Sequence, residues 1–116
     1  MAYFADLTPY AYLPPSRFTE GHNAVNIGWL DRSEPMEVGP VDLSFAAQLT
    51  EICASPVNLC RGWHTCQWCA KAHGNGEIRV TGADGTVYAA PILIAHYVSV
   101  HGYQPPKEFI QAVMTV

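Results

Sequence analysis

Two pairs of metal-ligating residues constrain the fold of this chain more than any other feature. Cys66 and Cys69 form a C-x-x-C motif, and His96 and His101 follow with H-x4-H spacing after a gap of 26 residues. The C-x-x-C spacing lets two thiolates bind one tetrahedral ion, and two histidines so spaced complete the usual zinc-finger ligand set. The sequence therefore predicts that two segments far apart in the chain meet at one zinc ion.

Other ligand sets remain open on the sequence alone. His64, two residues before Cys66, and Cys60 are alternative ligands. A site of four thiolates would add Cys53 and Cys60 to the C-x-x-C pair, although Cys53 is expected on the core face of a helix. A chain without metal, with free thiols and core histidines, is the remaining alternative. A thioredoxin-like redox motif is disfavoured, because we expect a loop before Cys66 and an antiparallel hairpin after Cys69 rather than a βαβ unit.

Hydrophobic periodicity predicts a strand, a helix and a hairpin around this motif. Apolar residues alternate over residues 22–30, which is typical of a strand with one buried face. Residues 40–53 have helical spacing, with Pro40 in the first turn and Pro56 after the end. An Asp-Gly pair between two β-rich runs indicates a hairpin over residues 77–90.

Two more helices are predicted in the last quarter of the chain. Pro91 and Gly102 frame the helix that carries both histidines, and Pro105-Pro106 opens the final helix. The predicted fold class is α+β. We expect a small single domain with a zinc knuckle, a β-hairpin and about three helices, in a treble-clef or enlarged zinc-finger-like arrangement.

The chain is predicted to comprise one domain and an N-terminal arm. Its 116 residues suffice to bury a hydrophobic core without disulfides. Residues 1–20 are rich in aromatic residues and prolines, which predicts an extended arm packed on the domain. Residues 21–116 then form the single α+β metal-binding domain.

Composition limits which cellular compartments and which classes of partner are expected. The net charge is −4 and no run of Lys or Arg is present, so we expect no nucleic-acid partner. The first residues lack the pattern of a signal peptide, and no apolar stretch approaches the length that crosses a bilayer. We therefore expect a cytoplasmic protein that does not bind membranes, with reduced cysteines. Charged residues make up only 14%, which favours an apolar surface covered by a protein partner or a second copy.

Several motifs along the chain carry a family resemblance. In chain order they are Tyr3-Phe4-x-Asp6-Leu7, Arg61-Gly62-x-His64-x-Cys66-x-x-Cys69, Gly76-Glu77-Ile78-Arg79-Val80, Tyr88-Ala89-Ala90-Pro91, His96-Tyr97-Val98-x-x-His101 and Tyr103-x-Pro105-Pro106-x-x-Phe109. With these motifs the chain resembles a family of small bacterial proteins known only as a domain of unknown function. The resemblance covers most of the chain. It implies that five residues form one unit: His64, Cys66, Cys69, His96 and His101. It implies no activity.

Two functional hypotheses follow from these observations. The first is a protein-interaction module with a structural zinc site, of which an immunity or antitoxin-like protein is one concrete version. No carboxylate lies within the C-x-x-C segment to serve as a metal-assisted base, which favours a structural role. The alternative is a small zinc- or His-dependent enzyme that uses His64 as an acid or base, beside Arg61 as a binding residue for an anion.

Overall fold

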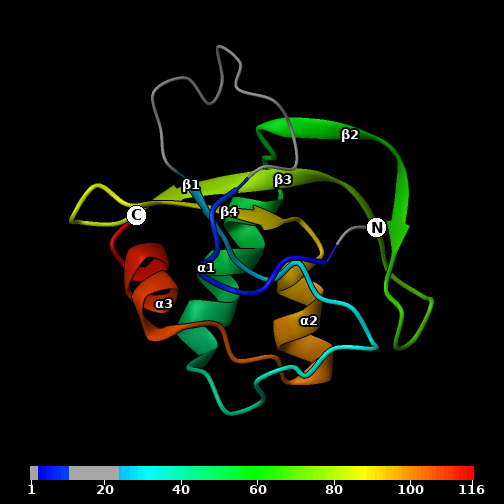
Figure 1. Ribbon diagram of the computed structural model, residues 1–116. Coiled ribbons are helices and arrows are strands. Elements are labelled where there is room, and N and C mark those ends of the chain that lie inside the picture. Colours follow the sequence, from blue (N-terminus) through cyan, green and yellow to red (C-terminus); the bar gives the residue numbers. More distant parts are fainter. Residues whose placement is uncertain (1–2, 11–23) are drawn as a thin grey trace.

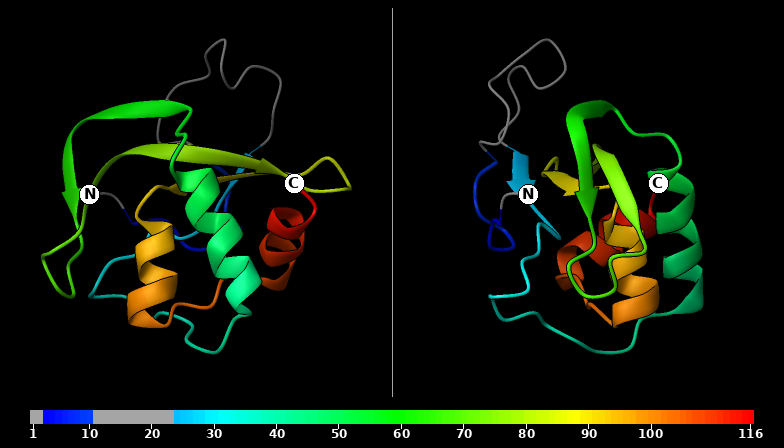
Figure 2. Two further views of the ribbon diagram at one scale, coloured as in Figure 1. Left: turned by 180° about the vertical axis from the view of Figure 1, so that it is seen from behind. Right: turned by 90° about the vertical axis from the view of Figure 1, so that its right-hand side faces the viewer.

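The computed structural model describes residues 3–10 and 24–116, apart from the side chains of residues 58–63. One curled sheet is covered on one side by three helices (Figures 1 and 2). The elements in chain order are β1 (Ala24–Asn26), α1 (Leu43–Cys53), β2 (Asn58–Thr65), β3 (His73–Thr81), β4 (Val87–Pro91), α2 (Ile94–His101) and α3 (Lys107–Met114). Within the described ranges, no helix combines the length and the apolar character needed to cross a lipid bilayer.

The sheet has four strands in the order β1-β4-β3-β2. β1 runs parallel to β4, and the other neighbours are antiparallel. The register of β2 against β3 shifts between Leu59 and His64, which marks a bulge, and bulges bend strands. The β2–β3 hairpin accordingly arches out of the sheet, and its tip descends beside α2 (Figure 1). This curl brings the C-x-x-C motif to the helix that carries the histidines.

The hydrophobic core lies between the sheet and the helices. Register partners in neighbouring strands share a face, and the pairs Ile78–Ala90 and Val80–Tyr88 point toward the helices. They meet the apolar stripes of the three helices, whose fully buried members include Phe45, Leu49, Ile94, Tyr97, Phe109 and Val113. Burial of aliphatic and aromatic side chains contributes about 1.5–3 kcal/mol each, so this layer supplies most of the driving force for folding.

Residues 3–10 lie along the outer edge of β1. The backbone N–H groups of Leu7 and Tyr10 donate to the carbonyl oxygens of Asn26 and Ala24, at 2.7 and 2.9 Å. The Asn26 N–H donates in return to the Thr8 carbonyl oxygen at 2.8 Å. This segment therefore satisfies the edge groups of β1 that would otherwise face water or another chain.

The second face of the sheet carries a buried polar cluster beside a small apolar one. Tyr10 packs against Ala24 and Ala89, and its hydroxyl reaches both carboxylate oxygens of Glu77 at 2.9 and 3.0 Å. Arg79 donates to Glu77 at 2.8 Å and lies over the Tyr10 ring, 4.5 Å from its centroid. Glu77 has no exposed surface, so this face holds a buried carboxylate paired with Arg79 next to its small apolar cluster.

The structure confirms the α+β class and corrects two details of the strands. Of the strand predicted over residues 22–30, the described part forms a strand only over β1. Gly28, with φ of 76°, ends the extended backbone on which the alternation of side chains depends. Both faces are buried there, since Ala24 and Asn26 are 7% and 0% exposed, so the prediction of one buried face was wrong. The segment before Cys66, predicted as a loop, is β2. Its glycine, cysteine and histidine residues obscured the alternation of a strand.

The hairpin and the helices agree with expectation apart from their starting points. β3 and β4 pair antiparallel around the Asp-Gly loop, and α2 ends before Gly102. The helix predicted from residue 40 is α1, which begins later because Asp42 still has extended backbone angles. Residues 1–2 and 11–20 of the predicted arm and residues 21–23 lie outside the described residues.

Candidate metal centre

The two cysteines lie in the turn that joins β2 to β3. The backbone N–H of Cys66 donates to the carbonyl oxygen of Ala72 at 2.9 Å, which closes the base of the turn. The N–H of Ala70 donates to the Cys66 carbonyl oxygen, also at 2.9 Å, which folds the chain back after Cys69. Ala70 adopts a left-handed conformation with φ of 58°, where a side chain is unfavourable. The turn thus presents both thiols from one short, hydrogen-bonded loop.

The two histidines come from α2, whose start is held close to the sheet by glycines. A Cβ atom at Gly28 would lie 2.7 Å from Cδ1 of Ile94, and one at Gly74 would lie 2.7 Å from Cγ1 of Ile92. Such contacts are too short, so a side chain at either position would displace the isoleucine, whereas glycine permits the close approach. Gly102, with φ of 73°, ends the helix directly after His101.

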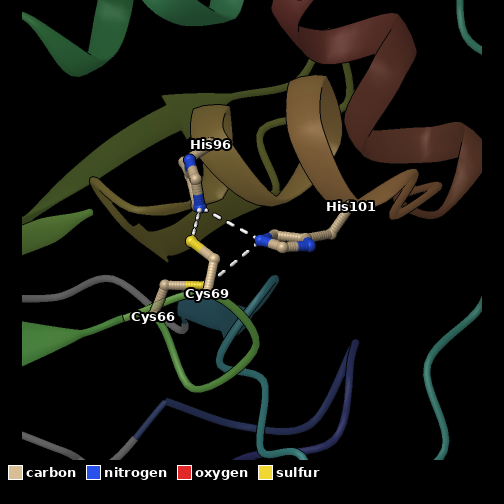
Figure 3. Close-up of side chains that lie close together, drawn as sticks. All are labelled: Cys66, Cys69, His96 and His101. Carbon is tan, nitrogen blue, oxygen red and sulfur yellow. Dashed lines mark hydrogen bonds between the residues drawn. The ribbon is translucent and has the colours of Figure 1, made fainter. Parts of the chain in front are cut away.

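The four candidate ligand atoms converge on one point between the turn and the helix (Figure 3). Cys66 Sγ lies 3.3 Å from His101 Nε2, and Cys69 Sγ lies 3.3 Å from His96 Nε2. The two Nε2 atoms are 3.1 Å apart. All four ligand atoms lie within 4.8 Å of one another. The residues could therefore bind a single metal ion.

The spacing of these atoms fits a tetrahedral site. Zinc–sulfur and zinc–nitrogen bonds of about 2.3 and 2.0 Å place tetrahedral ligands about 3.3–3.8 Å apart. The two S–N separations of 3.3 Å lie at the lower end of that range, and the N–N separation of 3.1 Å lies slightly below it. Two thiolates and two imidazoles in this geometry are typical of zinc and unlike the oxygen-rich sites of calcium or magnesium. The donor set therefore fits zinc, and the four ligand atoms lie close enough together to surround one ion.

Local interactions favour the protonation states that bind metal. The backbone N–H of Lys71 is the main cause that lowers the pKa of the Cys69 thiol, with smaller contributions from Cys66 and Ala72. Burial, followed by the proximity of His101, lowers the pKa of His96. Metal ligation requires the thiolate and the neutral imidazole, which are the forms favoured by these shifts.

An aromatic layer supports the centre from one side. Trp68, between the two cysteines, lies 5.7 Å from the ring of Tyr97 and 5.8 Å from that of His101. Tyr97 also neighbours His96, with ring centroids 6.3 Å apart. The rings of the turn and of α2 therefore pack together beside the candidate ligands. The Cys66 side chain is fully buried, whereas Cys69 and both histidines are partly exposed.

Of the alternative ligands, His64 and Cys53 lie outside the group of four, and the side chain of Cys60 is not described. His64 is partly buried on β2 opposite Gly74 and does not belong to the group of four. Cys53, at the end of α1, also lies outside the group, and burial raises the pKa of its thiol to about 11. Cys60 and Arg61 lie in β2, but their side chains fall outside the described residues.

Sequence comparison places the chain in a family. The model of a family described as Domain of unknown function (DUF7919) matches residues 2–114. The chain belongs to the DUF7919 family. Neither the search of curated proteins nor that of solved structures found a significant match. The match confirms the resemblance to a family of unknown function, and the family description assigns no activity.

One residue that shapes the centre was missed from sequence. Ala70 occupies the left-handed position after the second cysteine, a position at which glycine would signal a turn. Alanine gives no such signal. The β-rich run predicted from residue 77 did not reveal the turn either, because β3 in fact begins at His73.

Proposed function

We propose that this protein is a small cytoplasmic protein-interaction module whose fold is fastened by a structural zinc ion held by Cys66, Cys69, His96 and His101. The observation that carries the proposal is the convergence of the four ligand atoms within 4.8 Å, from a hairpin turn and a helix. Four protein ligands fill a tetrahedral shell and leave no position for a water, which is typical of structural zinc and not of catalytic zinc.

The zinc ion would act as a cross-link between two layers of the fold. Cys66 and Cys69 belong to the tip of a hairpin that curls away from the sheet, whereas His96 and His101 belong to α2 (Figures 1 and 3). Zinc would supply charge compensation for two thiolates and fix the hairpin against the helix. It would supply folding free energy and no chemical step.

Exposed apolar side chains support an interaction role. Val38, Leu43 and Val100 are 62%, 88% and 62% exposed. They lie at the end of the domain where α1 begins and α2 ends, and backbone hydrogen bonds from Gly39 to Gly102 and from Gln104 to Glu37 join these segments. Exposed apolar side chains gathered at one end are typical of a protein-binding surface. A protein partner or a second copy of the chain would cover them, as in an immunity or antitoxin-like protein of bacteria.

The aromatic N-terminal arm is less suited to binding a partner than this end of the domain. The ring of Phe4 packs against that of Trp29 at 5.7 Å, and Tyr10 is engaged by Glu77 and Arg79. These rings serve the domain itself. The proposed interaction surface is therefore the end formed by Val38, Leu43 and Val100.

Two measurements test the two parts of the proposal. Elemental analysis of chain purified without chelator should find about one zinc per chain; absence of any transition metal would reject the structural zinc. The L43K/V100K variant should lose self-association or partner binding in sedimentation velocity while its melting temperature is unchanged. Val57→Lys, at another exposed apolar residue, is the matched control. Equal binding by both variants would reject this surface.

A further inference from the structure

The two thiols of the candidate metal centre differ in their access to solvent. Cys66 has no exposed surface, whereas Cys69 is partly exposed at the tip of the β2–β3 hairpin. A small oxidant arriving from solvent therefore meets Cys69 first. Cys66 lies behind it on the same turn, as a resolving cysteine does in a redox-sensing pair.

The turn geometry brings the two sulfurs close enough to react with each other. Their Sγ atoms lie within 4.8 Å, and a disulfide requires about 2.0 Å. Both side chains project from one turn closed by the hydrogen bond from Ala70 to Cys66, so side-chain rotation supplies most of the approach. The bond would remove two of the four ligands at once, and the two histidines that remain form an incomplete site.

We propose that the centre is a peroxide-responsive switch in which oxidation of the Cys66–Cys69 pair to a disulfide releases the metal ion. The inference rests on the zinc site proposed above. The Cys69 thiolate attacks one oxygen of hydrogen peroxide and breaks the O–O bond. A sulfenic acid forms, and the hydroxide that leaves takes a proton to become water. The Cys66 thiolate then attacks the Cys69 sulfur and breaks the S–O bond. A disulfide forms, and the second hydroxide is protonated to water. The pair gives two electrons to the peroxide.

Release of the metal would disconnect the hairpin tip from α2. Across this boundary, the Sγ atom of each cysteine in the turn lies next to the Nε2 atom of a histidine in the helix. Trp68 crosses the same boundary and packs against Tyr97 and His101. Separation would move Trp68 into water, so tryptophan fluorescence reports the change directly. Dithiothreitol and zinc would restore the connected form.

The test uses the zinc-loaded full-length chain and hydrogen peroxide. A chromogenic zinc chelator should record release of one zinc per chain, and intact and peptide mass spectrometry should find one disulfide between Cys66 and Cys69. At short times dimedone should label Cys69 and not Cys66. Dithiothreitol with added zinc should reverse both changes. The Cys53→Ser variant should release zinc at the parental rate, since Cys53 lies outside the centre.

Each other outcome overturns the inference in a recognisable way. Retention of zinc under peroxide, or release that follows oxidation of another cysteine, would overturn the switch and leave the structural zinc intact. Irreversible oxidation of Cys69 to the sulfinic acid without a disulfide would also overturn it. A chain without zinc before any oxidant is added would overturn the proposed function, and this inference with it.

Discussion

The two faces of the sheet bury their residues by different physical means. The helix face is an apolar core with the candidate metal centre at one end, and its fully buried residues are nearly all aliphatic or aromatic. The second face buries the Glu77–Arg79 pair under Tyr10, next to three small side chains. In a hydrophobic core, the stability lost on truncating a side chain varies with the volume removed and with how well the site can collapse. A buried charge left without its partner costs several kcal/mol. The second face therefore depends on fewer residues, each of them individually more critical.

The largest effect is expected from disruption of the candidate metal centre on the helix face. Cys66→Ser should lower the free energy of unfolding by about 5 kcal/mol, less than the roughly 10 kcal/mol or more of isolated zinc modules, because this domain also has its own core. Thermal unfolding with and without chelator measures the change. Cys53→Ser serves as the matched control, since that thiol lies outside the centre. If Cys66→Ser and the parent melted at the same temperature, the structural role of the centre would be excluded.

A smaller loss is expected when the buried carboxylate on the second face is removed. Glu77→Ala should destabilise the chain by about 3–4 kcal/mol, because Arg79 would keep its charge in a site where its side chain is 13% exposed. The paired change to apolar residues, E77L/R79M, should recover most of that loss. Denaturant titration of the three proteins measures both effects. Equal stability of Glu77→Ala and the parent would show that the ion pair is not the critical contact of this face.

Alkaline pH should test Tyr10 on the same face. Burial, followed by the charge of Glu77, raises the pKa of Tyr10 to about 12, above the ordinary value of 10.0. Because the folded state holds its proton more tightly than the unfolded state, this stabilisation is complete below pH 10 and is lost between pH 10 and about 12.

Tyr10→Phe should remove that part of the pH dependence and cost about 2 kcal/mol at neutral pH, because its hydrogen bond ends on a charged group. Stability measured from pH 8 to 11.5 compares the variant with Tyr3→Phe, whose ring is 36% exposed. Identical pH profiles for parent and Tyr10→Phe would contradict the assignment.

The smallest effect concerns the backbone of the turn that carries Cys66 and Cys69. Ala70→Gly should stabilise the chain by about 0.5 kcal/mol, because glycine relieves the left-handed conformation at the cost of greater freedom in the unfolded state. Ala83→Gly, at an exposed position without positive φ, should give no gain. A melting temperature lowered equally by both changes would show that no strain resides at Ala70.

The sequence predicted the residues of the candidate metal centre more completely than it predicted the fold. The spacing of Cys66, Cys69, His96 and His101 predicted which four side chains come together, because metal chemistry restricts both residue types and intervals. The hairpin and helices followed from local periodicity and from proline and glycine. The edge strand β2 did not, because its composition is dominated by residues that also suit loops. The burial of Glu77 was also hidden, since it depends on Tyr10, which lies 67 residues earlier in the chain.

The placement of residues 3–10 has a consequence for the order in which the chain can fold during synthesis. Asp6 accepts a hydrogen bond from the Tyr103 hydroxyl at 2.7 Å across a separation of 97 residues, and β1 pairs only with β4 among the described strands. Residues 3–10 can pair early with β1, but this pair of segments meets β4 and Tyr103 only after most of the described chain has been synthesised. Closing so long a loop is slow. Nascent chains should therefore acquire the β3–β4 hairpin and α2 early, with the first strand added last.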